Sequence, residues 1–317
     1  MNRKIIKLLM TGLLLLSVVS CLNAQQNANA QKLLKQEFNL VPLHSKKTQY
    51  YEMVSKMQQH APDGTPLGWD VYRLYLRCIP SGDTSSGDEY TCLKFTVMLH
   101  DSAEVLIPSL TNWQYRFKLT GDSKDSAKQL FGIEHSKFEN LADQNGKKLP
   151  AANAYAVYNA FIDFHTMSVF AESSVNGKGA QNLHHIGDKV VHGSSFSKPP
   201  VNVGSQVAEG SYFKNGEITL ELKGLSLINE KVCGLLGYDS GESSFYMVMK
   251  PTANMQIPTK GSSHYWGDIY KDLASGWIQK ATLHEMVVSQ TTIPGMPQKV
   301  NSVVERNIVI RNVKSLP

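Results

Sequence analysis

The chain has 317 residues, which is enough for one large domain or for two domains of roughly 150 residues each. Hydrophobic residues make up 42% and charged residues 19%, so the chain can bury a core, and the composition excludes an intrinsically disordered protein. The 32 lysine and arginine residues exceed the 27 acidic residues, and this formal charge of +5 would by itself suggest a nucleic-acid or membrane-surface partner.

The first 24 residues have the pattern of a secretory signal peptide. A basic start containing Arg3, Lys4 and Lys7 precedes an almost uninterrupted apolar run over residues 8–19. That run is shorter than the roughly 20 apolar residues that a membrane-spanning helix needs, and polar residues follow it. We therefore expect a cleaved export signal rather than a membrane anchor.

Two processing routes are open for this signal. Leu22-Asn23-Ala24 would allow an ordinary signal peptidase to remove residues 1–24. Val18-Val19-Ser20-Cys21 resembles a bacterial lipoprotein box, in which residues 1–20 are removed and Cys21 is acylated. On either route the protein is expected to be exported, to the periplasm or to the outer membrane as a lipoprotein, and otherwise to be secreted.

Loss of the signal changes the charge argument. Three of the 32 basic residues leave with it, so 29 remain against 27 acidic residues, and the formal balance falls to +2. The remaining basic residues are scattered singly and do not interleave with aromatic residues. We therefore expect no nucleic-acid partner, and contact with a membrane only through a lipid on Cys21.

The rest of the chain is expected to form a tether and one domain. Residues 25–39, rich in glutamine, asparagine and alanine, are expected to be the tether. Residues 40–317 are expected to form a single, mainly antiparallel β domain. A segment without periodicity, residues 173–200, is either a long loop over the sheet or a linker that divides this domain into two halves.

Two cysteines flank the first predicted hairpin. Cys78 ends one alternating apolar segment and Cys92 begins the next, and the residues between them are typical of turns. Because an exported protein meets an oxidising environment, we expect a Cys78–Cys92 disulfide. Cys233 lies in an apolar context and is expected to be a buried thiol.

Strict alternation of apolar and polar residues predicts strands with one buried face. It occurs over residues 113–119, 217–223, 277–283 and 304–313, and glycine-rich turn signals separate the later segments. The hairpin pattern from Val207 to Val313 resembles exported bacterial proteins built on large curved antiparallel sheets, including lipoprotein-carrier-like folds. The predicted fold is mainly β, a large curved antiparallel sheet or sandwich.

One principal helix is expected within this β fold. Residues 151–165 follow a proline, are rich in alanine, and place apolar side chains along one helical stripe. A shorter helix is expected over residues 123–130.

Histidines near the unpatterned segment suggest a metal site. Imidazole is a ligand for Zn, Cu or Fe, and His184, His185 and His192 lie in that segment, with His165 at the end of the predicted helix. The spacing of the four residues matches no standard metal motif. The alternative is that they are ordinary surface or buried histidines, and no cofactor is otherwise expected.

Residues 261–268 are the other candidate binding segment. If they form a loop, His264, Tyr265 and Trp266 would suit stacking against sugar rings or an amphipathic ligand. The alternative is that the two aromatic residues cover one end of the β core.

Two fragments resemble catalytic motifs but are incomplete. Asp239-Ser240-Gly241 resembles an aspartic-protease loop, yet that chemistry needs two such carboxylates and the chain has a single Asp-Ser-Gly. Gly121-Asp122-Ser123 resembles the nucleophile block of GDSL-type esterases, but it has no Asp-x-x-His partner near the C-terminus. A hairpin turn and a helix cap explain these residues.

The sequence therefore favours an exported protein of the bacterial cell envelope with a non-catalytic role. It would bind an amphiphile, a glycan or an envelope partner on a concave face of the sheet. The alternative is a secreted hydrolase or metal-dependent enzyme that acts on an extracellular polymer through the histidine-rich loop.

Overall fold

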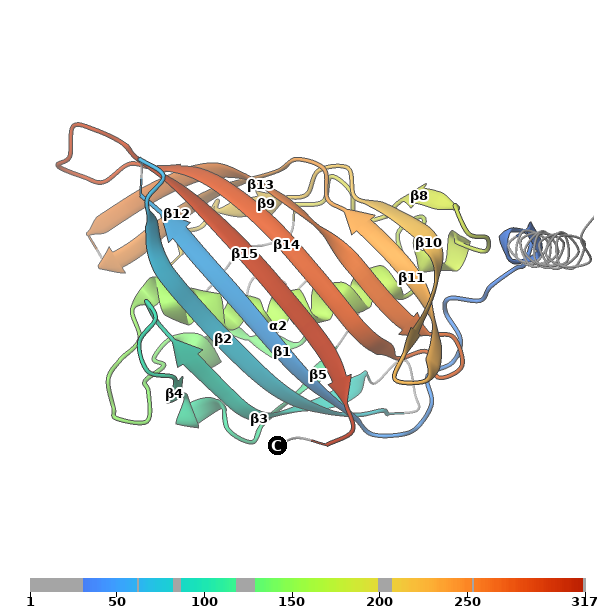
Figure 1. The fold of residues 1–317 in the computed structure, drawn as a ribbon. Coiled ribbons are helices and arrows are strands. Elements are labelled where there is room, and N and C mark those ends of the chain that lie inside the picture. Colours follow the sequence, from blue (N-terminus) through green and yellow to red (C-terminus); the bar gives the residue numbers. More distant parts are fainter. Residues whose placement is uncertain are drawn as a thin grey trace, which may run out of the picture.

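A single antiparallel sheet of 13 strands forms most of the protein (Figure 1). This computed structural model describes residues 31–61, 63–81, 87–117, 129–198, 207–252 and 254–315. The signal region with Cys21, the Gly121-Asp122-Ser123 block and residues 123–128 of the expected short helix lie outside these ranges. No helix within them is long and apolar enough to cross a membrane.

The main path through the sheet is β4-β3-β2-β1-β15-β14-β13-β11-β10-β8. Three strands lie off this path: β5 pairs with β3, β12 pairs with β13, and β9 pairs with β12. The first strand pairs with the last, so both strands lie inside the sheet and not at its edges. The strand bounds are β1 Gln49–His60, β2 Pro66–Ile79, β3 Asp88–Met98, β4 Val105–Leu106, β5 Trp113–Phe117, β8 Lys189–Val191, β9 Tyr212–Lys214, β10 Thr219–Ile228, β11 Lys231–Asp239, β12 Ser243–Thr252, β13 Met255–Asp272, β14 Ile278–Thr291 and β15 Val300–Val313.

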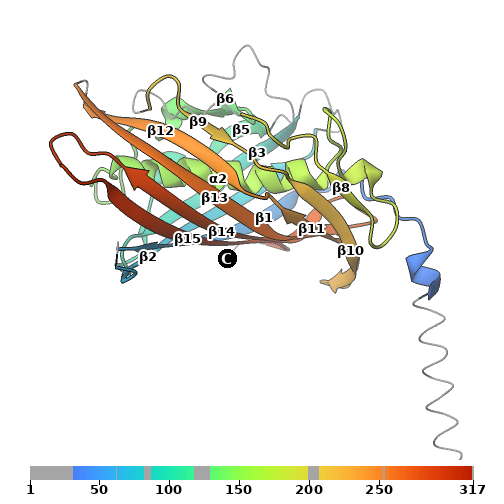
Figure 2. The same ribbon diagram turned by 90° about the horizontal axis from the view of Figure 1, so that it is seen from above.

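The sheet curls around one long helix, α2 (Ala151–Ala171) (Figure 2). Register shifts interrupt several strand pairs, for example between Gln58 and His60 in β1 and between Leu222 and Gly224 in β10. Such bulges bend a strand and increase its twist, which lets a sheet of this width curve. The mainly β fold with a large curved antiparallel sheet is thus confirmed.

Smaller elements lie between the strands and around the helix. The two-stranded sheet of β6 and β7 stands apart from the large sheet. In the described parts of the connections there are three short 3₁₀ helices. Their bounds are β6 Gln129–Leu130, β7 Ile133–Glu134, η1 Pro108–Leu110, η2 His135–Phe138 and η3 Ala180–Asn182.

The principal helix expected at residues 151–165 is confirmed and continues to Ala171. Phe161 stacks on Phe95 of β3 with 5.7 Å between ring centroids. Phe170, beyond the predicted end, packs against Tyr238 of β11 at 5.2 Å. Because both halves of the helix contact the sheet, α2 fills the concave side with the protein's own side chains.

A buried cluster of charges joins α2 to the sheet. The Arg306 guanidinium of β15 lies 3.1 Å from a carboxylate oxygen of Asp163 in α2, and it also pairs with Glu285 of β14. Burial raises the pKa of Asp163 even though Arg306 opposes this shift. Ser263 of β13 donates a hydrogen bond to Glu285, so the cluster spans three adjacent strands and the helix.

The C-terminal end of α2 is held by a lysine of the sheet. Lys271 of β13 is fully buried, and its Nζ donates to the carbonyl oxygen of Ala171 at 2.7 Å and to Glu172 at 2.8 Å. The last carbonyls of a helix have no intrahelical donor, so this ammonium satisfies one of them. His44 also contacts Glu172, at 2.9 Å, and ties the N-terminal segment to the same point.

The expected Cys78–Cys92 disulfide is wrong, because both residues are free, buried thiols. The β2–β3 hairpin pairs Cys78 with Tyr90 and Cys92 with Leu76, so the two cysteines are diagonal neighbours. Diagonal positions lie about 7–8 Å apart, whereas a disulfide spans about 4.4–6.8 Å between Cα atoms. Burial raises the pKa of both thiols. Cys233 is a buried thiol as expected, and burial raises its pKa to about 11.

The segment 173–200 is built onto the edge of the sheet over its described part. It contains η3 and then β8, which pairs with β10. Strands that precede this segment and strands that follow it belong to the same sheet.

Candidate functional site

The binding segment expected at residues 261–268 is a strand and not a loop. It belongs to β13, an 18-residue strand that pairs with β12 over its first part and with β11 over its last part. Successive side chains of a strand point to opposite faces of the sheet. The three candidate residues His264, Tyr265 and Trp266 are therefore divided between the two faces.

Tyr265 points inward and belongs to the core. It is buried, its ring stacks with that of Phe170 at 6.5 Å, and its hydroxyl donates to Asn215 at 2.9 Å. Burial raises its pKa. For Tyr265, the alternative that the aromatic residue covers the β core is the one observed.

His264 and Trp266 point outward, onto the convex face. There they join side chains of β14 in a group that we call the outer aromatic patch, defined as His264, Trp266, His284, Met286 and Val288. Trp266 is 40% exposed, Met286 38% and Val288 52%, which is unusual for large apolar side chains. The register places Trp266 opposite His284 and His264 opposite Met286, so the patch is continuous across the two strands.

The Trp266 ring lies beside two imidazoles. The His264 ring is 5.0 Å from it and tilted by 48°, and the His284 ring is 5.9 Å away and close to parallel, at 28°. Contacts of this kind restrict the rotamer of the indole. The patch thus presents an aromatic surface on a sheet face whose backbone is fixed by pairing on both sides.

Polar groups surround the aromatic rings. His264 Nε2 lies 3.0 Å from a carboxylate oxygen of Asp239, at the end of β11. His284 Nδ1 donates to the side-chain oxygen of Asn307 on β15, at 2.6 Å. These contacts orient both imidazoles and leave carboxylate, amide and ring-nitrogen atoms at the rim of the patch.

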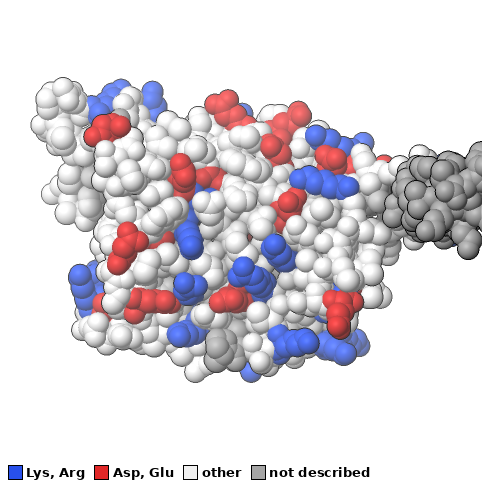
Figure 3. All heavy atoms as spheres, in the orientation of Figure 1, with Lys and Arg blue, Asp and Glu red and all other residues white. Residues whose placement is uncertain are grey.

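Charges of both signs are mixed on the convex face. Figure 3 shows this face, with Lys and Arg side chains interspersed with Asp and Glu and with uncharged areas between them. One such pair joins Lys223 of β10 to Asp268 of β13, the strand that carries Trp266, at 2.8 Å.

The histidines proposed as metal ligands have separate roles. His165 is buried in α2 with Nε2 2.8 Å from the Tyr115 hydroxyl, and burial lowers its pKa to about 3. His192 is buried too, accepts a hydrogen bond from the Ser194 backbone, and has its pKa lowered by burial to about 4.

The remaining two histidines of that proposal form a surface turn. The backbone N–H groups of His184 and His185 both donate to Asp188, each at 2.8 Å, and these bonds lower the pKa of the Asp188 carboxyl. Within the described ranges, no three or more His, Cys, Asp or Glu side chains are grouped so that they could hold a metal ion. The structure therefore does not bring the four histidines together.

The hairpin turn expected at Asp239-Ser240-Gly241 is wrong. β11 and β12 do not pair with each other but follow one another along the same side of β13, and the fragment is the short interruption between them. The Gly241 backbone N–H donates to the Asp239 side chain at 2.8 Å, and Gly241 has a positive φ of 57°. This interruption also places Asp239 next to His264, so its contribution is to orient a side chain of the patch.

Sequence reasoning identified His264 and Trp266 but missed His284, Met286 and Val288 as part of the same surface. The signal was present in β14, where these alternate residues face away from the core. Outward positions of a half-buried strand are usually polar, so Met286 and Val288 mark an unusual surface. Comparison with known proteins finds no family model and no curated protein that matches this chain.

Proposed function

We propose that the chain is an exported bacterial cell-envelope protein that binds a glycan, without catalysis, on the outer aromatic patch. The observation that carries this proposal is the exposed Trp266 indole, which lies beside two imidazoles on the convex face of the sheet. The signal-peptide pattern of residues 1–24 supports the cellular location.

A sugar ring suits the chemistry of the patch. One face of a pyranose consists mainly of C–H groups and packs on an aromatic plane, while its hydroxyls need donors and acceptors around that plane. Trp266 supplies the plane, and the carboxylate of Asp239 and the amide of Asn307 supply polar atoms beside it. Because paired strands hold these groups, little conformational entropy is lost on binding.

The filled interior favours a glycan over an amphiphile. An amphiphile would need an apolar cavity on the concave side of the sheet, where α2 lies (Figure 2). Phe161, Phe164 and Phe170 of that helix are each no more than 3% exposed, so they occupy this space. The concave face expected as the binding surface is thus covered by the helix, and the exposed aromatic group is on the convex face.

The proposal is tested by electrophoresis in native gels that contain dextran, mannan, laminarin or polygalacturonate. We expect at least one polysaccharide to retard the protein, and Trp266→Ala to weaken this binding by about tenfold or more, because the stacking plane is lost. Trp266→Phe should retain part of the binding.

The matched control is Tyr75→Ala, which removes a partly exposed aromatic residue from β2, on the same face but three strands from β14. This variant should bind like the original protein. Unchanged migration of the original protein in all four gels, or equal retardation of Trp266→Ala, would contradict the proposal.

A further inference from the structure

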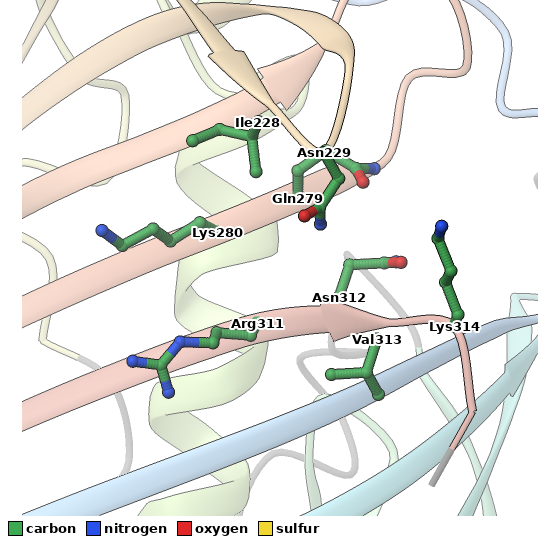
Figure 4. A pocket seen from close by; sticks show the side chains of 8 residues that line it. All are labelled: Ile228, Asn229, Gln279, Lys280, Arg311, Asn312, Val313 and Lys314. Atoms are coloured by element: carbon green, nitrogen blue, oxygen red, sulfur yellow. The ribbon is translucent and has the colours of Figure 1, made fainter.

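A pocket lies where β14 begins and β15 ends, beside the turn between β10 and β11. It has a volume of about 410 Å³, and its polar lining comes from Asn229, Gln279, Lys280, Arg311, Asn312 and Lys314 (Figure 4). Lys280 and Arg311 extend to the same side from adjacent strands, and Lys314 lies across the pocket from them. The lining contains three cationic side chains and no acidic one.

The cations of this pocket are not neutralised by carboxylates in the described part of the chain. No ion pair is formed there by Lys280, Arg311 or Lys314 within the 4.0 Å limit, and Lys280 instead lies 5.3 Å from the ring centre of Tyr270. The acid opposite Arg311 in the strand register is Glu52, and its carboxylate accepts a hydrogen bond from Tyr75.

The strand register places Arg311 between a carboxylate and a second cation, with Glu52 opposite it on β1 and Lys280 opposite it on β14. Lys280 and Arg311 are directly opposite each other in the β14–β15 pair. Like charges at directly opposed positions of an antiparallel pair destabilise it. An oxyanion bound between them would remove this repulsion, and the guanidinium can bind a carboxylate, phosphate or sulfate through two parallel hydrogen bonds.

The pocket and the outer aromatic patch share two strands and one face. Lys280 precedes His284 by four residues on β14, and Arg311 follows Asn307 by four residues on β15. At about 3.3 Å per residue, the two sites are roughly 13 Å apart along the strands. The partly exposed ring of Tyr270 on β13 is directly opposite Lys280, at the level of the pocket.

We propose that the glycan is acidic, and that it lies along β14 and β15 with one sugar on Trp266 and an anionic group in the pocket of Lys280, Arg311 and Lys314. This inference rests on the proposed function, since it names the class of glycan that the same face binds. The Asn229 amide would donate to the anion beside the three cations, whereas the amide groups of Gln279 and Asn312 already donate to the Trp277 carbonyl and the Gln49 side chain.

The test compares polygalacturonate with its methyl ester, which has the same sugar chain without the negative charge. The full chain should bind polygalacturonate about tenfold more tightly than the ester, and added salt should reduce this difference. Lys280→Gln and Arg311→Gln should each remove most of the preference while leaving the binding of the ester unchanged.

The matched control is Lys94→Gln, which removes one positive charge from an exposed position of β3 and should keep the preference. Equal binding of the acid and the ester, both lost in Trp266→Ala, would overturn the acidic glycan but not the proposed function. If the original protein bound neither polygalacturonate nor its methyl ester, both the acidic-glycan inference and the proposed function would be overturned.

A different anionic ligand is distinguished by a parallel experiment. Vesicles of phosphatidylglycerol and phosphatidylcholine carry phosphate headgroups without a sugar polymer. Binding to these vesicles that depends on Lys280 and Arg311, with no retardation by polygalacturonate, would overturn the proposal in favour of a lipid headgroup.

Discussion

Arg306 is the residue on which the interior polar contacts depend. It is one cation between two carboxylates, Asp163 and Glu285, all three largely withdrawn from water. Buried ions are costly unless their partners are present, because desolvation opposes the Coulomb attraction. The cluster therefore stabilises the packing of α2 on the sheet only while all three charges are present.

Replacing this cation should be severely destabilising. Arg306→Met leaves two buried carboxylates without a counter-ion, and we expect the free energy of unfolding in urea to fall by about 3–5 kcal/mol. Adding Asp163→Asn and Glu285→Gln to this variant should restore part of the loss, since the unpaired charges are then removed. A loss below about 1 kcal/mol in Arg306→Met would show that the cluster is solvated.

At the scale of elements, β13 and α2 show what the sequence could and could not predict. Alternation identified the later strands because their inward residues are apolar, but Gly261, Ser262, Ser263 and Gly267 gave the appearance of a loop. In the structure these glycines allow close approach: a Cβ at Gly267 would lie 2.0 Å from the Thr282 carbonyl oxygen. The sequence does not show which neighbour will approach, so a packing glycine is indistinguishable from a turn glycine.

The C-terminal end of α2 shows a second limit of prediction from the sequence. The helical stripe predicted the element, yet the last residues are stabilised by Lys271, about 100 positions away in the chain. The candidate site has the same property. His264, Tyr265 and Trp266 were recognised as one segment of sequence, whereas the patch and the cationic pocket exist only through the pairing of β13, β14 and β15.

Removing the lysine that caps the helix should loosen its C-terminal turn. Lys271→Met leaves the Ala171 carbonyl without its donor and leaves His44 as the remaining partner of the buried Glu172 carboxylate, and we expect about 3 kcal/mol of stability to be lost. Amide hydrogen exchange near residues 168–172 should accelerate more than elsewhere in α2. Lys260→Met, at an exposed position of the same strand, should change stability by less than about 0.5 kcal/mol.

At the scale of the whole molecule, burial makes stability depend on pH through three histidines. The pKa values of His135 and His192 are lowered by burial to about 4, and that of His165 to about 3. In the unfolded chain a histidine titrates near 6.5, so below that pH the unfolded state binds more protons than the folded state. Their contribution is therefore complete above about pH 6.5 and declines as the pH falls toward 4.

The urea concentration at the midpoint of unfolding should accordingly be lower at pH 5 than at pH 7.5. Each of the three histidines contributes a slope of up to about 1.4 kcal/mol per pH unit within this window. His165→Phe removes one of these groups, so the number of protons taken up on unfolding should decrease by about one, and the free energy of unfolding should change less steeply with pH. The lost Tyr115 contact lowers the stability of this variant at every pH. An unchanged slope in this variant would exclude His165 as a source of the pH dependence.

The pairing of β1 with β15 has a consequence for how the molecule can be assembled. Tyr50 lies opposite Val313, so the centre of the sheet closes only when residues more than 250 positions apart in sequence come together. When the chain is synthesised or exported with its N-terminus first, one side of β1 remains unpaired until β15 is available. Removing β15 would therefore not shorten the sheet at an edge. It would divide the sheet into two parts that no longer share backbone hydrogen bonds, with α2 packed between them.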